Sequence, residues 1–138
     1  MATTSLLSND AASNAARAVF DEIKQARNVP DVNNFWKALA HDPDTLRRVW
    51  DSVKAVMAPG ALDPMVKEMI YVAVSAAHGC GYCVHSHTAA ARRAGMTPEM
   101  HAELLAVIGL ASQTNALATA LQVPVDPMFM VPETDPRG

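Results

Sequence analysis

The chain has 138 residues, of which 50% are hydrophobic and 18% are charged, and its formal net charge is −3. This length suffices for one domain with its own core, and the balance of apolar and charged residues excludes an intrinsically disordered chain. The sequence has no run of lysines or arginines that would favour nucleic acid or an anionic membrane surface. We therefore expect a single globular domain over residues 1–138, with no nucleic-acid partner and no membrane partner.

Apolar residues recur at helical spacing along most of the chain, and no segment has the alternation of a strand. The predicted helices are, in chain order, residues 10–27, a short one near 33–40, 43–57, 64–78, 80–94 and 98–119. Asp42, Asp63 and Thr97 each precede a proline, which is the order of an N-cap and a first helical residue. Gly95 follows two arginines and an alanine, as at a helix end. The sequence predicts an all-α domain of about six helices.

The two ends of the chain carry weaker signals. Residues 122–138 contain four prolines, so we expect an extended C-terminal tail. The first ten residues lack a basic segment followed by an apolar one, and the most apolar run, residues 69–77, is too short to cross a bilayer. Two cysteines in a chain without an export signal favour catalysis or metal binding over a structural disulfide. We expect a cytoplasmic protein.

Residues 78–87 place two cysteines and a histidine on one face of a helix. At about 100° per residue, Cys80, Cys83 and His87 fall at roughly 0°, 300° and 340°. A thiol reacts as the thiolate, and a helix N-terminus favours the anion by only ~0.3–1 kcal/mol, which is less than one pKa unit. A second sulfur and a proton-accepting histidine must supply the rest. We expect Cys83 to lose its proton readily, because His87 lies one turn away and Cys80 is its neighbour.

A carboxylate that orients His87 would complete the site, and Glu68 is the candidate. A continuous helix would separate the two residues by roughly 28 Å, so the chain must reverse near Gly79. Glu68 then lies eleven residues before the turn and His87 eight after it, at comparable heights on two packed helices.

Glu68, the Cys80-x-x-Cys83 pair and His87, with their spacing, resemble the signature of the alkylhydroperoxidase D-like branch of the carboxymuconolactone decarboxylase superfamily. That signature has a glutamate twelve residues before the first cysteine and a histidine four after the second. The flanking sequence is similar too, namely Lys67-Glu68, residues 73–77 and residues 39–43. The resemblance covers roughly residues 33–119.

The resemblance implies an all-helical fold that assembles as a symmetric trimer or hexamer. It also implies hydroperoxide reduction by a dithiol–disulfide cycle, with no metal and no organic cofactor. In that cycle Cys83 attacks the peroxide, Cys80 resolves the intermediate and meets the reductant, and Glu68 and His87 relay protons. The implied reductant is an external dithiol of the lipoyl or thioredoxin type. Tyr82 stands where the best-known peroxidase of the family has a histidine.

Other interpretations of these residues stay open. Cys80 and Cys83 can be buried as small hydrophobic residues, and Glu68 can be a solvated helix charge. A structural zinc site would use both cysteines, His87 and either His78 or His85. A disulfide exchanger or redox sensor would use the same thiols without consuming peroxide. A cofactor-free decarboxylase or lyase is the remotest alternative, because that branch of the superfamily generally lacks the cysteine pair.

Overall fold

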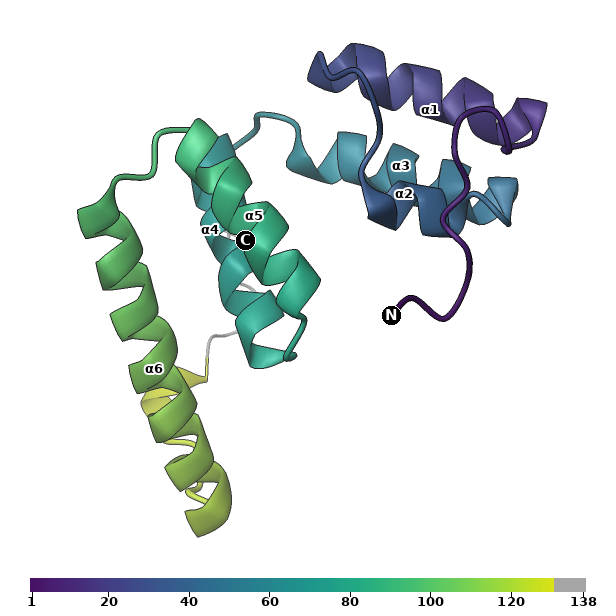
Figure 1. The fold of residues 1–138 in the computed structure, drawn as a ribbon. Coiled ribbons are helices and arrows are strands. Elements are labelled where there is room, and N and C mark those ends of the chain that lie inside the picture. The colour runs from purple at the N-terminus through teal and green to yellow at the C-terminus, as the bar shows by residue number, and fades with distance from the viewer. Residues whose placement is uncertain (131–138) are drawn as a thin grey trace. The chain divides into compact units, whose positions relative to one another are not determined.

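The computed structural model describes residues 1–130, and every regular element in that part of the chain is a helix (Figure 1). The predicted all-α class is confirmed. The chain divides into two compact units, Met1–Gly60 and a second unit that begins at Ala61, and each is described by itself. The expectation of one domain over the whole chain stays a prediction.

The first unit contains α1 (Asn14–Arg27), α2 (Asn34–Leu39) and α3 (Pro43–Met57). Both α1 and α2 pack against α3. Trp36 and Trp50 meet edge to face at the centre of this core, with ring centroids 5.6 Å apart, and the Arg27 guanidinium lies over both rings. The largest side chains that are completely enclosed there are Val19, Phe20, Ile23 and Leu46.

The helix starts follow the capping residues. Asp42 accepts hydrogen bonds from the backbone N–H groups of Asp44 and Thr45, as predicted for the start of α3. The predicted start of the first helix at residue 10 is wrong by four residues. Ser13 caps α1 by accepting from the backbone N–H of Ala16, and the residues before it form a turn.

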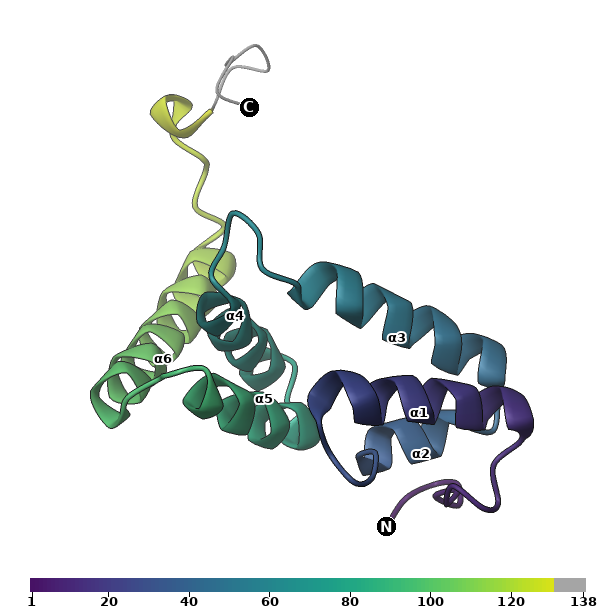
Figure 2. The ribbon, with the colours of Figure 1, turned by 90° about the horizontal axis from the view of Figure 1, so that it is seen from above.

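The second unit contains α4 (Pro64–Ala77), α5 (Gly81–Arg93) and α6 (Pro98–Leu121), followed by the short 3-10 helix η1 (Pro127–Phe129). α4 packs against both α5 and α6 (Figures 1 and 2). Few of the described residues of this unit are buried, and Val72 is the largest of them that is completely enclosed. The tail was predicted to be extended over residues 122–138. Its described part, up to residue 130, contains the single turn of η1, and the rest lies outside the described residues.

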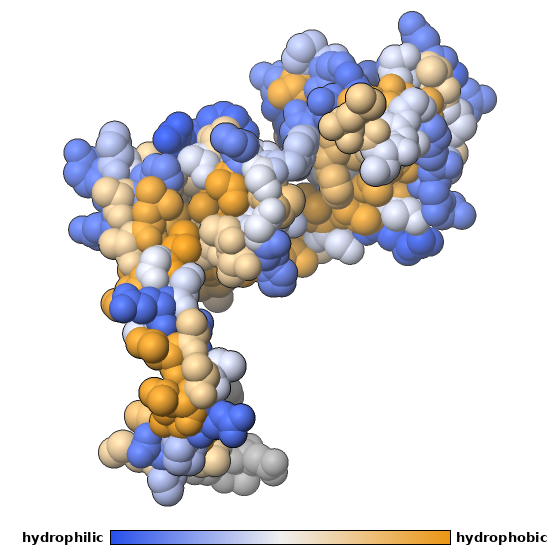
Figure 3. Space-filling model, turned by 60° about the horizontal axis from the view of Figure 1, so that its bottom comes forward, coloured by the Kyte–Doolittle hydropathy of each residue, from blue (hydrophilic) through white to orange (hydrophobic). Residues whose placement is uncertain are grey.

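Along α6 the apolar side chains are exposed (Figure 3). None of its 24 residues is buried within the second unit. Among the described residues, this helix alone is long and apolar enough to cross a membrane, by length and composition. Residues 69–77, the run that the sequence analysis considered for a membrane span, lie within α4.

Candidate active site

A three-residue turn between α4 and α5 brings the predicted site residues together. Gly79 has a φ of +71°, a backbone conformation that residues with a side chain rarely adopt. The turn is closed by a hydrogen bond in which the backbone N–H of Cys80 donates to the carbonyl of Ser75 at 2.9 Å. A Cβ atom at Gly79 would meet nothing within 4 Å, so the backbone conformation and not the space calls for glycine. α5 therefore runs back along α4, as the sequence required.

Glu68 and His87 form a direct pair across the two helices. The Oε2 atom of Glu68 lies 2.6 Å from Nδ1 of His87. An ionised carboxylate only accepts hydrogen bonds, so Nδ1 carries the ring hydrogen and donates a hydrogen bond to Glu68. The lone pair of the neutral ring is then on Nε2. The His87 and Glu68 side chains are 23% and 19% exposed, so the pair is partly shielded from water but reachable from it.

Tyr71, which the residue spacing alone did not single out, covers one face of this imidazole. It lies three residues after Glu68, so both residues share a face of α4. Its ring stacks on His87 with centroids 3.6 Å apart and an angle of 16° between the planes. The helical spacing from Glu68 places Tyr71 beside the carboxylate, but the ring stack depends on side-chain torsions that the spacing does not determine.

Cys80 is the N-cap residue of α5. Its sulfur accepts a hydrogen bond from the backbone N–H of Cys83, with an N···S distance of 3.4 Å. Both cysteines are partly buried. The sulfur of Cys80 thus lies where an N-cap oxygen lies in most helices, at the positive end of the helix dipole.

The two thiols differ in pKa, and Cys80, not Cys83, has the lower one. Hydrogen bonds from the Cys83 thiol and from the Cys83 backbone N–H lower the pKa of Cys80. The same thiol–thiol hydrogen bond raises the pKa of Cys83 to about 11, with further contributions from burial and from the Cys80 charge. In the described part of the chain no hydrogen bond joins the His87 imidazole to either sulfur. These directions make Cys80 the more readily ionised thiol, and the expectation that Cys83 loses its proton readily stays a prediction.

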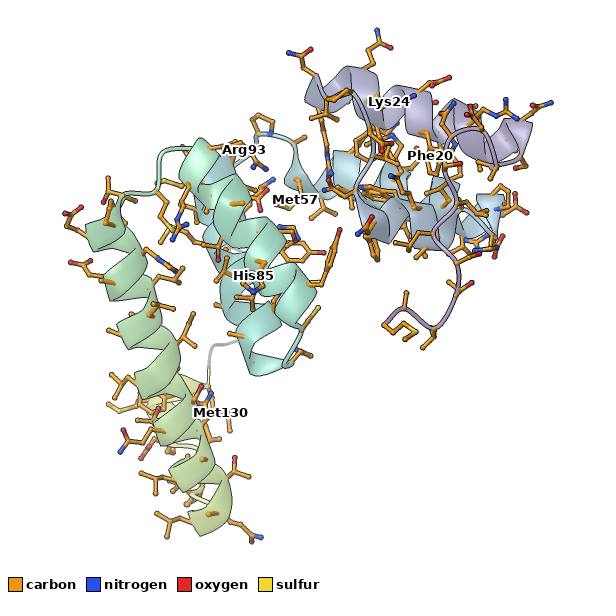
Figure 4. All side chains as sticks on the ribbon, viewed as in Figure 1. Phe20, Lys24, Met57, His85, Arg93 and Met130 are labelled. Carbon is orange, nitrogen blue, oxygen red and sulfur yellow. The ribbon has the colours of Figure 1, made fainter. Side chains whose placement is uncertain are left out.

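The histidines considered for a zinc site do not gather around the sulfurs. His85 is exposed on α5 (Figure 4), and the His78 ring lies 3.2 Å from the carbonyl oxygen of Val74. Within residues 1–130 no three or more side chains of His, Cys, Asp or Glu are placed to hold a metal ion together. The arrangement contains two thiols of unequal acidity and a histidine–carboxylate pair, which are the groups that thiol redox chemistry needs.

Comparison with known proteins gives consistent results. Residues 43–126 match the model of the carboxymuconolactone decarboxylase family. The crystal structure of an alkylhydroperoxidase AhpD core from Rhodospirillum rubrum is 56% identical. It superposes with a TM-score of 0.91 over 96% of this chain and 99% of that one.

Two curated relatives are similar over shorter segments. The alkyl hydroperoxide reductase AhpD of Solibacter usitatus is 41% identical over 73 residues, which are 53% of this chain and 40% of that protein. An uncharacterized protein in the cox locus of Paracoccus denitrificans is 38% identical over 63 residues, 46% of this chain and 54% of the relative. The chain thus spans about half or less of the length of these two relatives. It belongs to the carboxymuconolactone decarboxylase family and to the alkylhydroperoxidase D-like branch within it.

Proposed function

We propose that the chain is a thiol-dependent hydroperoxide reductase in which Cys80 and Cys83 cycle between dithiol and disulfide. The observation that carries the proposal is the Glu68–His87 pair, joined at 2.6 Å one helical turn after Cys83. Cys80 and Cys83 share the first turn of the same helix. Two relatives that bear the names alkyl hydroperoxide reductase and alkylhydroperoxidase support the same reaction class.

The raised pKa of Cys83 determines what His87 must do. A thiol with a pKa of about 11 is protonated at neutral pH, so Cys83 needs a base as it attacks. In the proposed step His87 accepts that proton on Nε2 while the Cys83 sulfur bonds to one peroxide oxygen. The O–O bond breaks, the alkoxide leaves as an alcohol by taking the proton back, and Cys83 becomes a sulfenic acid. The Glu68 carboxylate stabilises the imidazolium that exists between these events.

Cys80 then closes the cycle. Its sulfur, the more acidic of the two, attacks the Cys83 sulfur, the S–O bond breaks, and hydroxide leaves as water after taking up a proton. The sum is two thiols and one hydroperoxide giving one disulfide, one alcohol and one water. An external dithiol, of the lipoyl or thioredoxin type, must return two electrons. A cytoplasmic setting, in which such donors keep thiols reduced, stays part of the proposal.

The test is to treat the reduced chain with one equivalent of cumene hydroperoxide and to count the free thiols. We expect both thiols to disappear and cumyl alcohol to form in equal amount. Cys80→Ser keeps a capping hydroxyl on α5 and is expected to stop at a sulfenic acid on Cys83, which dimedone traps. If both wild-type thiols survive the peroxide, the proposal is wrong. If Cys80→Ala and Cys83→Ala leave a decarboxylase activity intact, the chain is a lyase instead.

The lowered pKa of Cys80 favours a second candidate, a protein disulfide exchanger or redox sensor. An acidic cysteine that caps the first turn of a helix suits attack on a disulfide, and such attack needs no base for Cys83. Steady-state turnover separates the two functions. Rapid exchange with lipoamide or a protein disulfide, together with negligible peroxide consumption, would establish the exchanger.

The exposed α6 helix supports the proposal that copies of the chain associate, as a trimer or a hexamer. From residue 104 to residue 121 the helix has no charged side chain. Leu105, Leu110 and Leu117 are all more than half exposed. A helix that is apolar on most sides is stable in water only when something covers it, and symmetric self-association does so.

Sedimentation and light scattering test this assembly. We expect wild type to sediment as an oligomer and Leu110→Glu to dissociate it, because the substitution puts a charge into the buried contact. Glu103→Gln, an exposed change near the start of α6, is the matched control. A monomeric wild type, or a Leu110→Glu oligomer of unchanged size, would contradict the role of α6.

A further inference from the structure

Two residues of α4 hold the same imidazole of α5 in different ways. Glu68 binds the edge of the His87 ring, with Oε2 at 2.6 Å from Nδ1. Tyr71 covers the face of the ring, with centroids 3.6 Å apart and planes inclined by 16°. Glu68 and Tyr71 are three residues apart, on adjacent positions of one helix face.

We propose that Tyr71 is a positioning residue that fixes the plane of the His87 ring and so the direction of Nε2. This inference rests on the proposed function, in which Nε2 takes the proton of Cys83. The hydrogen bond at Nδ1 and the covalent bond to Cβ hold one edge of the ring, and small rotations about the side-chain torsions still tilt its plane. A ring stacked on the face removes that freedom, because any turn breaks the parallel contact.

The contact is made by the ring face and not by the phenol oxygen. Near-parallel planes bring the two π surfaces together, so the hydroxyl lies at the edge of the contact. Tyr71 is 38% exposed, whereas the buried positions of the second unit are Val72, Ser75, Ala91 and Met96. The tyrosine therefore adds little to the core of this unit, and its replacement should leave the helices in place.

Three variants distinguish the contribution of the Tyr71 ring face from that of its hydroxyl group and from a general effect of changing the α4 surface. Tyr71→Phe keeps an aromatic face and removes the oxygen. Tyr71→Leu removes the stack. Ile70→Leu is the matched control, because Ile70 is the preceding residue of α4 and is 48% exposed. Circular dichroism verifies that each variant keeps its helices.

The first readout is the His87 ring itself, observed by NMR in protein labelled with ¹⁵N-histidine. His87→Gln identifies its signals among those of the five histidines. We expect the ring protons of His87 to be shielded by the Tyr71 ring in wild type, Tyr71→Phe and Ile70→Leu. In Tyr71→Leu the shielding should vanish. An unchanged His87 spectrum in Tyr71→Leu would overturn the proposal, whether or not the chain consumes peroxide.

The second readout is the reactivity of Cys83. We expect Tyr71→Leu to slow peroxide oxidation of Cys83 roughly tenfold with KM unchanged, since misdirection of a general base forfeits part of its effect. Tyr71→Phe should stay close to wild type. The rate of Cys83 alkylation in a Cys80→Ser background reports how well His87 deprotonates Cys83 without peroxide. It therefore tests the positioning role even in a chain that is no peroxidase. A Tyr71→Leu variant as fast as wild type in alkylation, or a Tyr71→Phe variant as slow as Tyr71→Leu, would refute the assignment.

Discussion

The two units of the chain differ in where their apolar residues lie. In the first unit ten hydrophobic residues form a continuous buried cluster around the Trp36–Trp50 contact. Its outer surface carries ion pairs such as Glu22–Arg47. In the second unit few of the described side chains are buried, the site residues are partly exposed, and many apolar side chains of α6 are exposed. The first unit has the features of a stable core, whereas the second contains the candidate site and an exposed apolar surface.

Substitutions at the histidine–carboxylate pair should affect only the chemistry, and they have the largest expected effect. We expect His87→Gln to slow peroxide-dependent loss of the Cys83 thiol by roughly 10²–10⁴-fold, the usual contribution of a general base. Glu68→Gln should slow the same reaction by a smaller factor, because the imidazole stays in place. Stopped-flow thiol oxidation measures both. The pair has no such role if His87→Gln reacts as fast as Glu103→Gln, a change at an exposed carboxylate.

A substitution in the first core should affect only stability. Phe20 is 1% exposed, so Phe20→Ala removes a buried ring and is expected to lower the free energy of unfolding by about 3–5 kcal/mol. Val29→Ala, at a residue that is 38% exposed, should change it by about 0.5 kcal/mol or less. Urea denaturation gives the values. The rate of thiol oxidation should be unchanged under conditions in which Phe20→Ala is folded. A lower oxidation rate in the folded variant would show that the two units do not act separately.

The order of thiol ionisation is a third test. At pH 7.5 we expect iodoacetamide to modify Cys80 first, because its pKa is lowered, while Cys83 reacts fully only as the pH approaches its pKa of about 11. Cys80→Ser should lower the pKa of Cys83 and speed its alkylation, since it removes the neighbouring thiolate. Peptide mass spectrometry follows each residue. Faster labelling of Cys83 in wild type would reverse the assignment.

The smallest effect is expected at the surface of the first unit. Hydrogen bonding to the Arg47 side chain lowers the pKa of Glu22 from 4.5 to about 2. A carboxyl group with a lowered pKa in the folded state contributes stability above pH 4.5, and this is lost as the pH falls from 4.5 towards 2. The melting temperatures of wild type and Glu22→Gln should therefore differ slightly at pH 6 and converge near pH 2. A constant difference in melting temperature across that range would exclude a contribution of Glu22 ionisation to stability.

The sequence was sufficient for most helix boundaries because they depend on local chemistry. An aspartate or threonine before a proline indicated the starts of α3, α4 and α6, and the structure places those side chains on the expected backbone groups. The start of α1 was harder to predict, since Asn9, Asp10 and Ser13 all offer an acceptor. Ser13 caps the helix in the structure.

The sequence also predicted that Glu68 meets His87, because Gly79 had to reverse the chain between them. The acidity of the two thiols could not be predicted in the same way. It depends first on the hydrogen bond between the two thiols and then on the Cys83 backbone N–H that the Cys80 sulfur accepts, and so on side-chain placement within the first turn of α5. The Tyr71 stack likewise depends on side-chain torsions and not on residue spacing.

The capping sulfur of α5 has a consequence for the helix that bears it. The atom that accepts the Cys83 amide hydrogen is also one of the two that the proposed cycle oxidises. A thiolate is a good acceptor and a disulfide sulfur is a poor one, so each turn of the proposed cycle would weaken and then restore the hydrogen bond at the start of α5. Amide exchange at Cys83 should accordingly run faster in oxidised protein, so that the first turn of α5 reports the redox state of the chain.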